Sequence, residues 1–304
     1  MFNYISNIES SSLNRFQFSF LLLLGSFCLW SQPALVKKDN SPHQSGFVTV
    51  NGVKLHFLDW GGKGEALLFI TGSGDNAHVF DEFALKFTDR FRVLALTRRG
   101  YGESEKPLTG YDIPTLTEDV RQFLDYMKIQ KVILAGHSAG GNELLQFAKS
   151  YPKRIIKLVF LDAAYDRREV LTLELNDPLI ESSIENNSSS ELTIEEKIQA
   201  AYFKHMDEYI PDFNSIKVPA LSFYAIHESH WGIQPDMEDS LKNKAQNYIV
   251  QYVQPYQWRN IERFKKEVPN GRVKVLRNTK HYIFRDSKRK AEVVKEMRAF
   301  LLDK

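Results

Sequence analysis

The sequence contains a single cysteine, Cys28, among its 304 residues. One thiol can form neither an internal disulfide framework nor a cysteine-rich zinc site. The chain also lacks an excess of charge, because 40 Lys and Arg face 38 Asp and Glu and leave a net charge of +2. This balance, without a basic stripe, argues against nucleic acid as a partner. Since 43% of the residues are hydrophobic and 26% are charged, the composition is that of a folded globular protein with a substantial core.

Long apolar runs are absent except near the N-terminus, where residues 16–30 follow Arg15. This run is shorter than the ~20 residues that a membrane-spanning helix needs. The pattern predicts a signal peptide over residues 1–32, with export to the periplasm or the exterior. A membrane-anchored chain is the alternative, and it requires that this segment stays uncleaved or that Cys28 carries a lipid. The polar residues 33–45 are interpreted as a tether.

Short apolar runs alternate with amphipathic segments from Gly46 onward. Two β-rich runs flank Asn51-Gly52, which predicts a hairpin with a tight turn. Further strands are predicted at residues 66–71, 92–96, 131–135, 157–161, 220–225 and 272–276, and helices at residues 115–127, 139–150 and 287–302. This order predicts an α/β fold, in which helices cover both faces of a mostly parallel, eight-stranded sheet. Ligands of such sheets bind beyond the carboxyl ends of the strands.

Residues 167–213 interrupt this order, because they contain no strand-like run and hold eleven acidic against four basic residues. We interpret them as a helical cap, inserted between two parts of the core at residues 46–166 and 214–304. A second helical stretch is expected at residues 237–268, with a break at Pro255. Four aromatic residues of the cap either form an apolar wall or anchor its helices. They are Tyr202, Phe203, Tyr209 and Phe213.

The segment Gly136-His137-Ser138-Ala139-Gly140 has the spacing G-x-S-x-G. A buried strand is predicted before it and a helix after it, and small residues allow the sharp turn that would lift Ser138 above the sheet. The pattern therefore predicts Ser138 as a nucleophile. In the simpler alternative, the glycines only permit a strand-to-helix turn and Ser138 caps the helix. His137 faces away on such a turn and is assigned a packing role.

These features resemble the α/β-hydrolase superfamily, in particular its compact esterase-like members with a cap. Residues 70–75 stand where that family has its oxyanion loop, and residues 97–104 are similar to its D-x-R-G-x-G-x-S turn. The resemblance covers the chain beyond the predicted signal peptide and tether. Two positions depart from the family pattern, since Thr71 replaces the usual histidine and Thr97 the usual aspartate.

A serine nucleophile needs a base, and the base works best when a carboxylate orients it. The resemblance implies His281 as the base, because this histidine follows the last predicted strand. It favours Glu228 as the carboxylate, since Glu228 follows the strand after which the family usually has its acid. Asp162, which ends an earlier strand, is the alternative acid, and Asp166 is a further one.

The resemblance also implies two oxyanion donors, the backbone N–H groups of Ser73 and Ala139. Gly72 lets the loop approach the reacting centre closely and is a candidate for binding substrate, with an ordinary turn after the strand as the alternative. His78 and Phe80 follow in the same loop and are candidates for lining the substrate pocket, with packing as the alternative.

The sequence as a whole predicts a serine hydrolase that forms an acyl-enzyme. Carboxylic esters of small or medium apolar molecules are the expected substrates, and a small molecule is the only expected partner. The alternatives are an exopeptidase or amidase of the same fold and a catalytically silent ligand-binding sensor. No cofactor and no metal are expected, because His227 and His230 at a spacing of three residues have no further clustered ligands.

Overall fold

The computed structural model describes residues 41–179 and 193–303. The predicted signal peptide and the first part of the predicted tether lie outside the described residues, as does part of the predicted cap. Strand β1 (Gln44–Val50) begins within the range predicted as tether. No helix of the described part of the chain is both long enough and apolar enough to cross a membrane.

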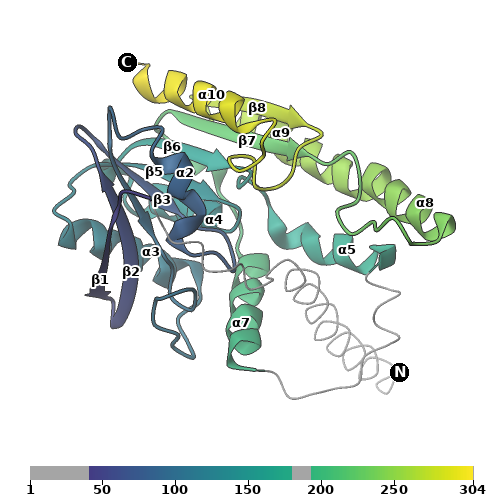
Figure 1. Cartoon of the computed structure of the whole chain (residues 1–304), viewed down its shortest axis with the longest axis horizontal. Coiled ribbons are helices and arrows are strands. Elements are labelled where there is room, and N and C mark those ends of the chain that lie inside the picture. The colour runs from purple at the N-terminus through teal and green to yellow at the C-terminus, as the bar shows by residue number, and fades with distance from the viewer. Residues whose placement is uncertain (1–40, 180–192, 304) are drawn as a thin grey trace.

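The described residues form one eight-stranded sheet with the order β1-β2-β4-β3-β5-β6-β7-β8, which confirms the predicted fold class (Figure 1). Strands β1 to β2 and β2 to β4 pair antiparallel, and all other neighbours pair parallel. The remaining strands are β2 (Val53–Gly61), β3 (Ala66–Ile70), β4 (Arg92–Leu96), β5 (Val132–His137), β6 (Ile155–Leu161), β7 (Ala220–Ile226) and β8 (Gly271–Arg277).

The predicted hairpin joins β1 to β2. Both residues of its turn have positive φ angles, 48° at Asn51 and 76° at Gly52. A two-residue turn of this kind matches the right-handed twist of the two strands. This explains why the Asn-Gly pair is a reliable sequence signal for the hairpin.

Helices cover both faces of the sheet, as predicted. On one face, α3 (Ile113–Tyr126), α4 (Gly140–Ser150) and α9 (Gln254–Glu267) contribute to one hydrophobic cluster. On the other face, α2 (Asp81–Ala84) and α10 (Lys290–Leu302) contribute to a second cluster.

The central strand β3 connects the two clusters. Its residues Leu68 and Ile70 belong to the first cluster, whereas Leu67 and Phe69 belong to the second. Successive side chains of a strand point to opposite faces, so a strand buried on both sides reads as a continuous apolar run.

The chain between β6 and β7 leaves the sheet. Its described elements are η3 (Arg167–Glu169), α5 (Val170–Leu175), α7 (Ile194–Glu208) and η4 (Phe213–Ser215), and Figure 1 shows α5 and α7 outside the sheet layers. Helix α7 begins with a capping box, in which Thr193 and Glu196 bond each other's backbone N–H groups.

The four cap aromatic residues pack against the core. Tyr202 contacts a cluster that includes Tyr101 and Ala139, and it is fully buried. Phe213 is also fully buried and belongs to the main core. Phe203 and Tyr209 are partly buried against the same cluster as Tyr202. The structure therefore supports their role as anchors of the cap.

The predicted break at Pro255 is wrong. Helix α8 (Asp239–Tyr248) continues through a π-helical turn (Ile249–Val253) directly into α9, where Pro255 lies in the first turn. The Gln254 N–H bonds the carbonyl of Ile249, one residue further back than in an α-helix. A proline lacks an N–H and clashes with the carbonyl four residues earlier, and a wider turn removes that conflict without ending the helix.

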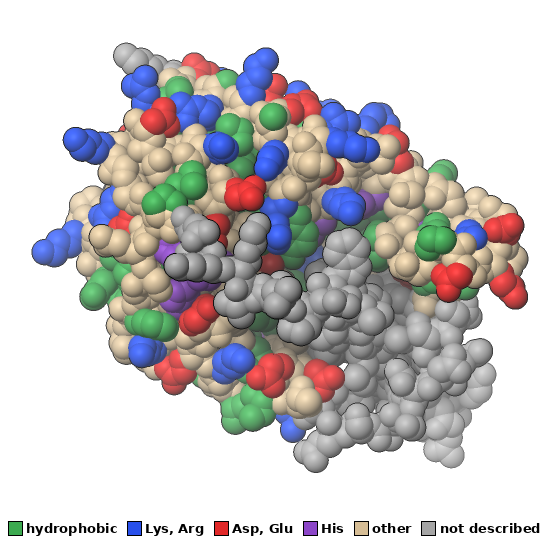
Figure 2. Space-filling model, viewed as in Figure 1, with side chains coloured by type: hydrophobic (Ala, Val, Ile, Leu, Met, Phe, Trp, Pro, Cys, Tyr) green, Lys and Arg blue, Asp and Glu red, His purple; other side chains and the backbone are tan. Residues whose placement is uncertain are grey.

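The surface carries charges of both signs. Figure 2 shows Lys and Arg interspersed with Asp and Glu over the described part of the face in view. This distribution agrees with the small net charge of the chain.

Candidate active site

Ser138 lies at a sharp turn between β5 and α4 and has a φ of 51°. A serine rarely adopts this left-handed conformation, and surrounding packing has to hold it there. A Cβ at Gly136 would lie 2.9 Å from the carbonyl group of Gly140, and one at Gly140 would lie 2.9 Å from the carbonyl oxygen of Ile70. Glycine is therefore required at both positions. This is the geometry of a nucleophile elbow.

Asp162 lies directly after β6 and pairs with His281. Its Oδ2 is 2.6 Å from the Nδ1 of His281. The other oxygen, Oδ1, accepts hydrogen bonds from the Tyr165 hydroxyl (2.7 Å) and from the backbone N–H of Ala225 on β7 (2.9 Å). Both oxygens of this buried carboxylate thus have partners, and its orientation toward His281 is fixed.

The electrostatic surroundings favour the charged form of Asp162. Burial acts to raise the pKa of Asp162, but the hydrogen bond and the charge of His281 outweigh it, with help from His227 and Tyr165. The resulting pKa lies below the usual value of an aspartate. A carboxylate that stays ionised can hold an imidazole in one tautomer and stabilise its protonated form.

The preference for Glu228 as the partner of His281 is corrected by the structure. Glu228 is exposed, and its backbone carbonyl accepts a hydrogen bond from the side chain of Gln246 (2.6 Å). Both β6 and β7 end at the same edge of the sheet, so position along the chain does not distinguish the two carboxylates. The loop after β8 decides between them, because it carries His281 to the end of β6.

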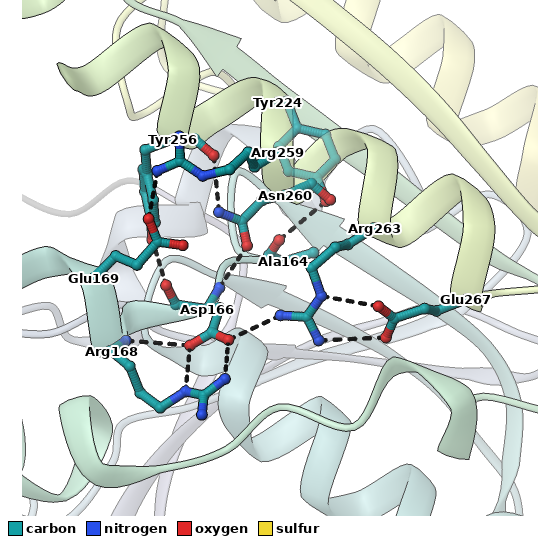
Figure 3. Close-up of polar contacts among 10 residues, drawn as sticks. All are labelled: Ala164, Asp166, Arg168, Glu169, Tyr224, Tyr256, Arg259, Asn260, Arg263 and Glu267. Carbon is teal, nitrogen blue, oxygen red and sulfur yellow. Dashed lines mark hydrogen bonds and ion pairs between the residues drawn. The ribbon is translucent and has the colours of Figure 1, made fainter. Parts of the chain in front are cut away.

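Asp166, the third candidate acid, belongs to a different network (Figure 3). Its carboxylate accepts hydrogen bonds from Arg168 (2.6 Å for Nη2) and from Arg263 of α9 (2.8 Å). Its backbone N–H donates to Asn260, and its carbonyl accepts from the Tyr256 hydroxyl. Asp166 therefore fastens the beginning of the cap to α9.

His281 reaches the elbow from the loop after β8. Its ring centroid is 4.6 Å from that of His137, the residue before Ser138. With Nδ1 on Asp162, Nε2 is the nitrogen that can accept a proton. No hydrogen bond joins the Ser138 hydroxyl to His281 within the described residues, and such contacts are often long before substrate binds.

His137 has the packing surroundings predicted for it. The ring is fully buried among the rings of His281, Tyr282 and Phe284. Burial lowers the pKa of His137, partly offset by Asp75. The neutral, buried imidazole of His137 packs against the ring of His281.

The loop after β3 lies close to the elbow. A Cβ at Gly72 would lie 3.2 Å from the Cβ of Ser138 and 2.9 Å from Nδ1 of His137. Only glycine fits this approach. No acceptor among the described residues bonds the backbone N–H of Ser73 or of Ala139. The predicted oxyanion role of these two groups requires such unused N–H groups.

A ring of three hydrogen bonds joins this loop to the cap, and no sequence pattern predicted it. Gln199 of α7 donates to the Ser73 hydroxyl (2.7 Å), and the Tyr101 hydroxyl donates to the Gln199 carbonyl oxygen (3.0 Å). Ser73 and Tyr101 oxygens are 3.1 Å apart. Since each hydroxyl has one proton, Ser73 donates to Tyr101, and the ring closes in one direction.

Two predicted pocket residues lie elsewhere. Phe80 is fully buried and stacks on Phe69, with ring centroids 4.7 Å apart, so it belongs to the core under β3 and is not a lining residue. The segment Ala77–Phe80 forms a 3₁₀ helix that returns the chain to the sheet. His78 contacts Asp81 on the same turn, 3.1 Å from Nδ1 to Oδ2.

Comparison with known proteins agrees with the observed fold. A family profile described as alpha/beta hydrolase fold matches residues 65–213. The chain has the α/β-hydrolase fold. The chain is similar over almost its whole length to a solved structure described as a membrane phospholipase A, a novel bacterial virulence factor. The TM-score is 0.62 and the identity is 19%, over 99% of this chain and 98% of that one.

Two curated relatives match parts of the chain. An uncharacterized protein of Mycobacterium tuberculosis is 32% identical over 133 residues, which are 44% of this chain and 39% of that protein. The 2-(acetamidomethylene)succinate hydrolase of Mesorhizobium japonicum is 30% identical over 164 residues, 54% of this chain and 56% of that enzyme. The chain thus matches 39% to 56% of the length of these relatives.

A buried contact between Arg98 and Glu143 lies between the loop after β3 and α4. One nitrogen of Arg98 donates to Glu143 (3.0 Å) and to the carbonyl of Thr71 (2.8 Å). Burial raises the pKa of Glu143 to about 7, against the opposing charge of Arg98. Since α4 carries Glu143 and starts at the elbow, this contact connects the loop after β3 to the helix that follows Ser138.

The raised pKa of Glu143 predicts a pH-dependent stability. Between pH 4.5 and about 7 the folded chain keeps a proton on Glu143 that the unfolded chain has lost. The contribution of Glu143 to the free energy of unfolding is therefore largest below pH 4.5. It falls as the pH rises toward 7, by ~2–3 kcal/mol between pH 5 and 8. Glu143→Gln should remove this decline, as measured by urea unfolding at both pH values.

The exposed Glu262 of α9 gives the matched control. Glu262→Gln should leave the pH dependence of unfolding unchanged. Parallel pH dependences in wild type and Glu143→Gln would show that Glu143 is ionised throughout this range.

Proposed function

We propose that this α/β hydrolase cleaves carboxylic esters of small or medium apolar molecules through an acyl-enzyme on Ser138. The observation that carries the proposal is the 2.6 Å contact of Asp162 with His281, at the edge of the sheet where the elbow presents Ser138. A hydroxyl, an imidazole and a buried carboxylate in this chain order are the parts that acyl transfer requires.

In the first half of the reaction, Ser138 Oγ forms a bond to the acyl carbon while Nε2 of His281 takes its proton. The negative charge that develops on the carbonyl oxygen is stabilised by the N–H groups of Ser73 and Ala139. When the tetrahedral intermediate collapses, the bond to the alcohol oxygen breaks, and His281 returns the proton to that oxygen. Asp162 stabilises the imidazolium ion in between.

In the second half, water attacks the acyl group on Ser138, and His281 takes one of its protons. Collapse of this second intermediate breaks the bond to Ser138 Oγ, which regains the proton from His281. The carboxylic acid leaves and the enzyme is restored. His281 accepts and returns each proton that is transferred, so the cycle needs no other general acid or base.

Ala139, which follows Ser138, packs against the rings of Tyr101 and Tyr202. Because both rings are buried, they act on a substrate only by making the surroundings of Ser138 less polar, which favours an apolar acyl group. The acidic composition of the cap disfavours strongly anionic substrates. Arylamides and thioesters use the same apparatus, and an amidase or exopeptidase is therefore an outcome that the substrate panel below can identify.

Labelling with a fluorophosphonate probe tests the nucleophile. We expect the wild-type chain to be labelled and to hydrolyse chromogenic esters faster than matched thioesters and arylamides. Ser138→Ala should abolish both the label and hydrolysis, because the attacking oxygen is gone. Folded wild-type protein that takes up no label would favour the silent sensor, and faster cleavage of aminoacyl-arylamides would favour the exopeptidase.

A pair of isosteric substitutions tests the acid. Asp162→Asn should lower kcat for ester hydrolysis by ~10⁴, the loss typical when the carboxylate that orients a catalytic histidine becomes an amide. Glu228→Gln should leave kcat within about twofold, since surface substitutions outside a site have small effects. If Glu228→Gln removes the activity and Asp162→Asn does not, the assignment of Asp162 is wrong.

The hydrogen-bonded ring predicts that the cap supports the oxyanion site. Gln199→Ala should lower kcat about tenfold, less than the loss of a whole oxyanion donor, because the Ser73 backbone is less well held. Tyr101→Phe should have a similar effect, and the double variant should lose little more, since both changes open the same ring.

Gln246→Ala is the matched control, because Gln246 bonds the backbone of the exposed Glu228. It should leave kcat unchanged. Steady-state kinetics separates the effects, and a Gln199→Ala chain that changes only KM would assign the ring to substrate binding instead.

A further inference from the structure

A second group of chemically reactive side chains lies away from Ser138. His43 precedes β1, His78 belongs to η1 (Ala77–Phe80), and Asp81 begins α2. One ligand atom from each of the three lies within 4.8 Å of the other two. Figure 2 shows histidine side chains gathered on the side of the molecule that carries β1 and β2.

The separations suit a metal ion. Nδ1 of His78 is 3.1 Å from Oδ2 of Asp81, and Nε2 of His43 is 3.8 Å from Oδ1. Tetrahedral ligands with bonds of about 2.0–2.1 Å to zinc have neighbouring donor atoms about 3.3 Å apart. The observed distances run to different oxygens of Asp81 and lie on both sides of this value. Because one atom from each residue lies within 4.8 Å of the other two, side-chain rotations would bring three donor atoms around one ion.

One oxygen of this group is buried without a hydrogen-bond donor. Among the described residues, none donates a hydrogen bond to Oδ1 of Asp81, although this atom is shielded from solvent. A buried carboxylate oxygen is costly unless a cation or a donor faces it. An ion between Asp81 and His43 would supply that partner.

Neighbouring rings hold the two histidines in place. The Trp60 ring meets His43 edge to face, and the Trp60 indole N–H bonds the Ser41 hydroxyl (3.0 Å), which fixes the chain just before His43. The ring of His56 is stacked on that of His78, at 25°. His56 itself is not a ligand, because its two ring nitrogens face Ser45 and Thr97.

We propose that His43, His78 and Asp81 bind a divalent transition-metal ion of the zinc type, with water as the fourth ligand. Two imidazoles and one carboxylate are a donor set that zinc accepts, and three protein ligands leave one position open. The ion cross-links the segment before β1 to the η1–α2 turn. This turn directly follows the loop that carries Ser73, and its cap residue Asn76 bonds the backbone N–H of His78.

The competing explanation is a metal-free contact. Asp81 lies between two histidines, and protonated imidazoles would attract it without any ion. The two explanations differ in one property. Zinc or a chelator should change the stability of the chain if these residues bind a metal, but not if they form only an ion pair.

Zinc binding to the full chain, purified without a histidine tag, tests the proposal. Isothermal titration calorimetry with Zn²⁺ should give one saturable site in wild type. Zinc at 100 times its dissociation constant should raise Tm relative to EDTA by about 4 °C or more. His78→Ala and Asp81→Asn should each weaken binding by ~100-fold or more, because the loss of a ligand exceeds the 10–100-fold cost of losing a group that only supports one.

Two control variants separate this site from other histidines. His205→Ala removes an exposed histidine of α7 and should leave zinc binding unchanged. His281→Ala removes the proposed catalytic base, and the same affinity and stoichiometry in this variant would show that the site is independent of Ser138. This result would stand even if the chain had no esterase activity.

Two results would overturn the proposal. The first is the absence of saturable zinc binding to wild type. The second is binding that survives in both His78→Ala and Asp81→Asn chains, each shown to be folded by circular dichroism in EDTA. A Tm that falls in His78→Ala but is insensitive to zinc in wild type would identify the metal-free ion pair.

Discussion

The contact between Asp162 and His281 joins residues 119 positions apart, and the geometry of the site depends on it. Asp162 follows β6 and His281 follows β8, so the bond has to pass over the end of β7. Strand β7 takes part, because the N–H of Ala225 donates to the same carboxylate (2.9 Å). The three strands must therefore be aligned in register before the imidazole can be oriented. The site can therefore be ordered only in a chain whose sheet has formed correctly.

Much of the fold could be predicted because its signals are local. Buried strands such as β3 and β5 are continuous apolar runs, and the Asn51-Gly52 turn has the conformation that only a few residues adopt readily. The elbow is also local, since its glycines are required by contacts within one strand-turn-helix unit and its neighbouring strand. For the same reason the turn at Ser138 could be located from sequence, and the predicted strand limits differ from the observed ones by a few residues only.

The remaining features depend on contacts between distant segments. Glu228 and Asp162 both follow buried strands, and only the path of the loop after β8 distinguishes them. Phe80 follows a glycine-containing loop as a pocket residue would, yet a short 3₁₀ helix returns it to the core. Pro255 has the usual signature of a helix break, but a π-helical turn accommodates it. In each case, a tertiary contact decides among conformations that the local sequence permits equally well.

The loop after β3 illustrates how several such contacts determine one backbone position. Arg98 holds the carbonyl of Thr71 and ties it to α4 through Glu143. Ser73 is bonded to Tyr101 and to Gln199 of the cap. Asp75 accepts a hydrogen bond from the Tyr282 hydroxyl, next to His281. The N–H of Ser73 is thus positioned by side chains from four separate parts of the chain. This convergence holds the loop in one conformation, as the proposed role of the Ser73 N–H as an oxyanion donor requires, because such a donor works only when it is aimed in advance.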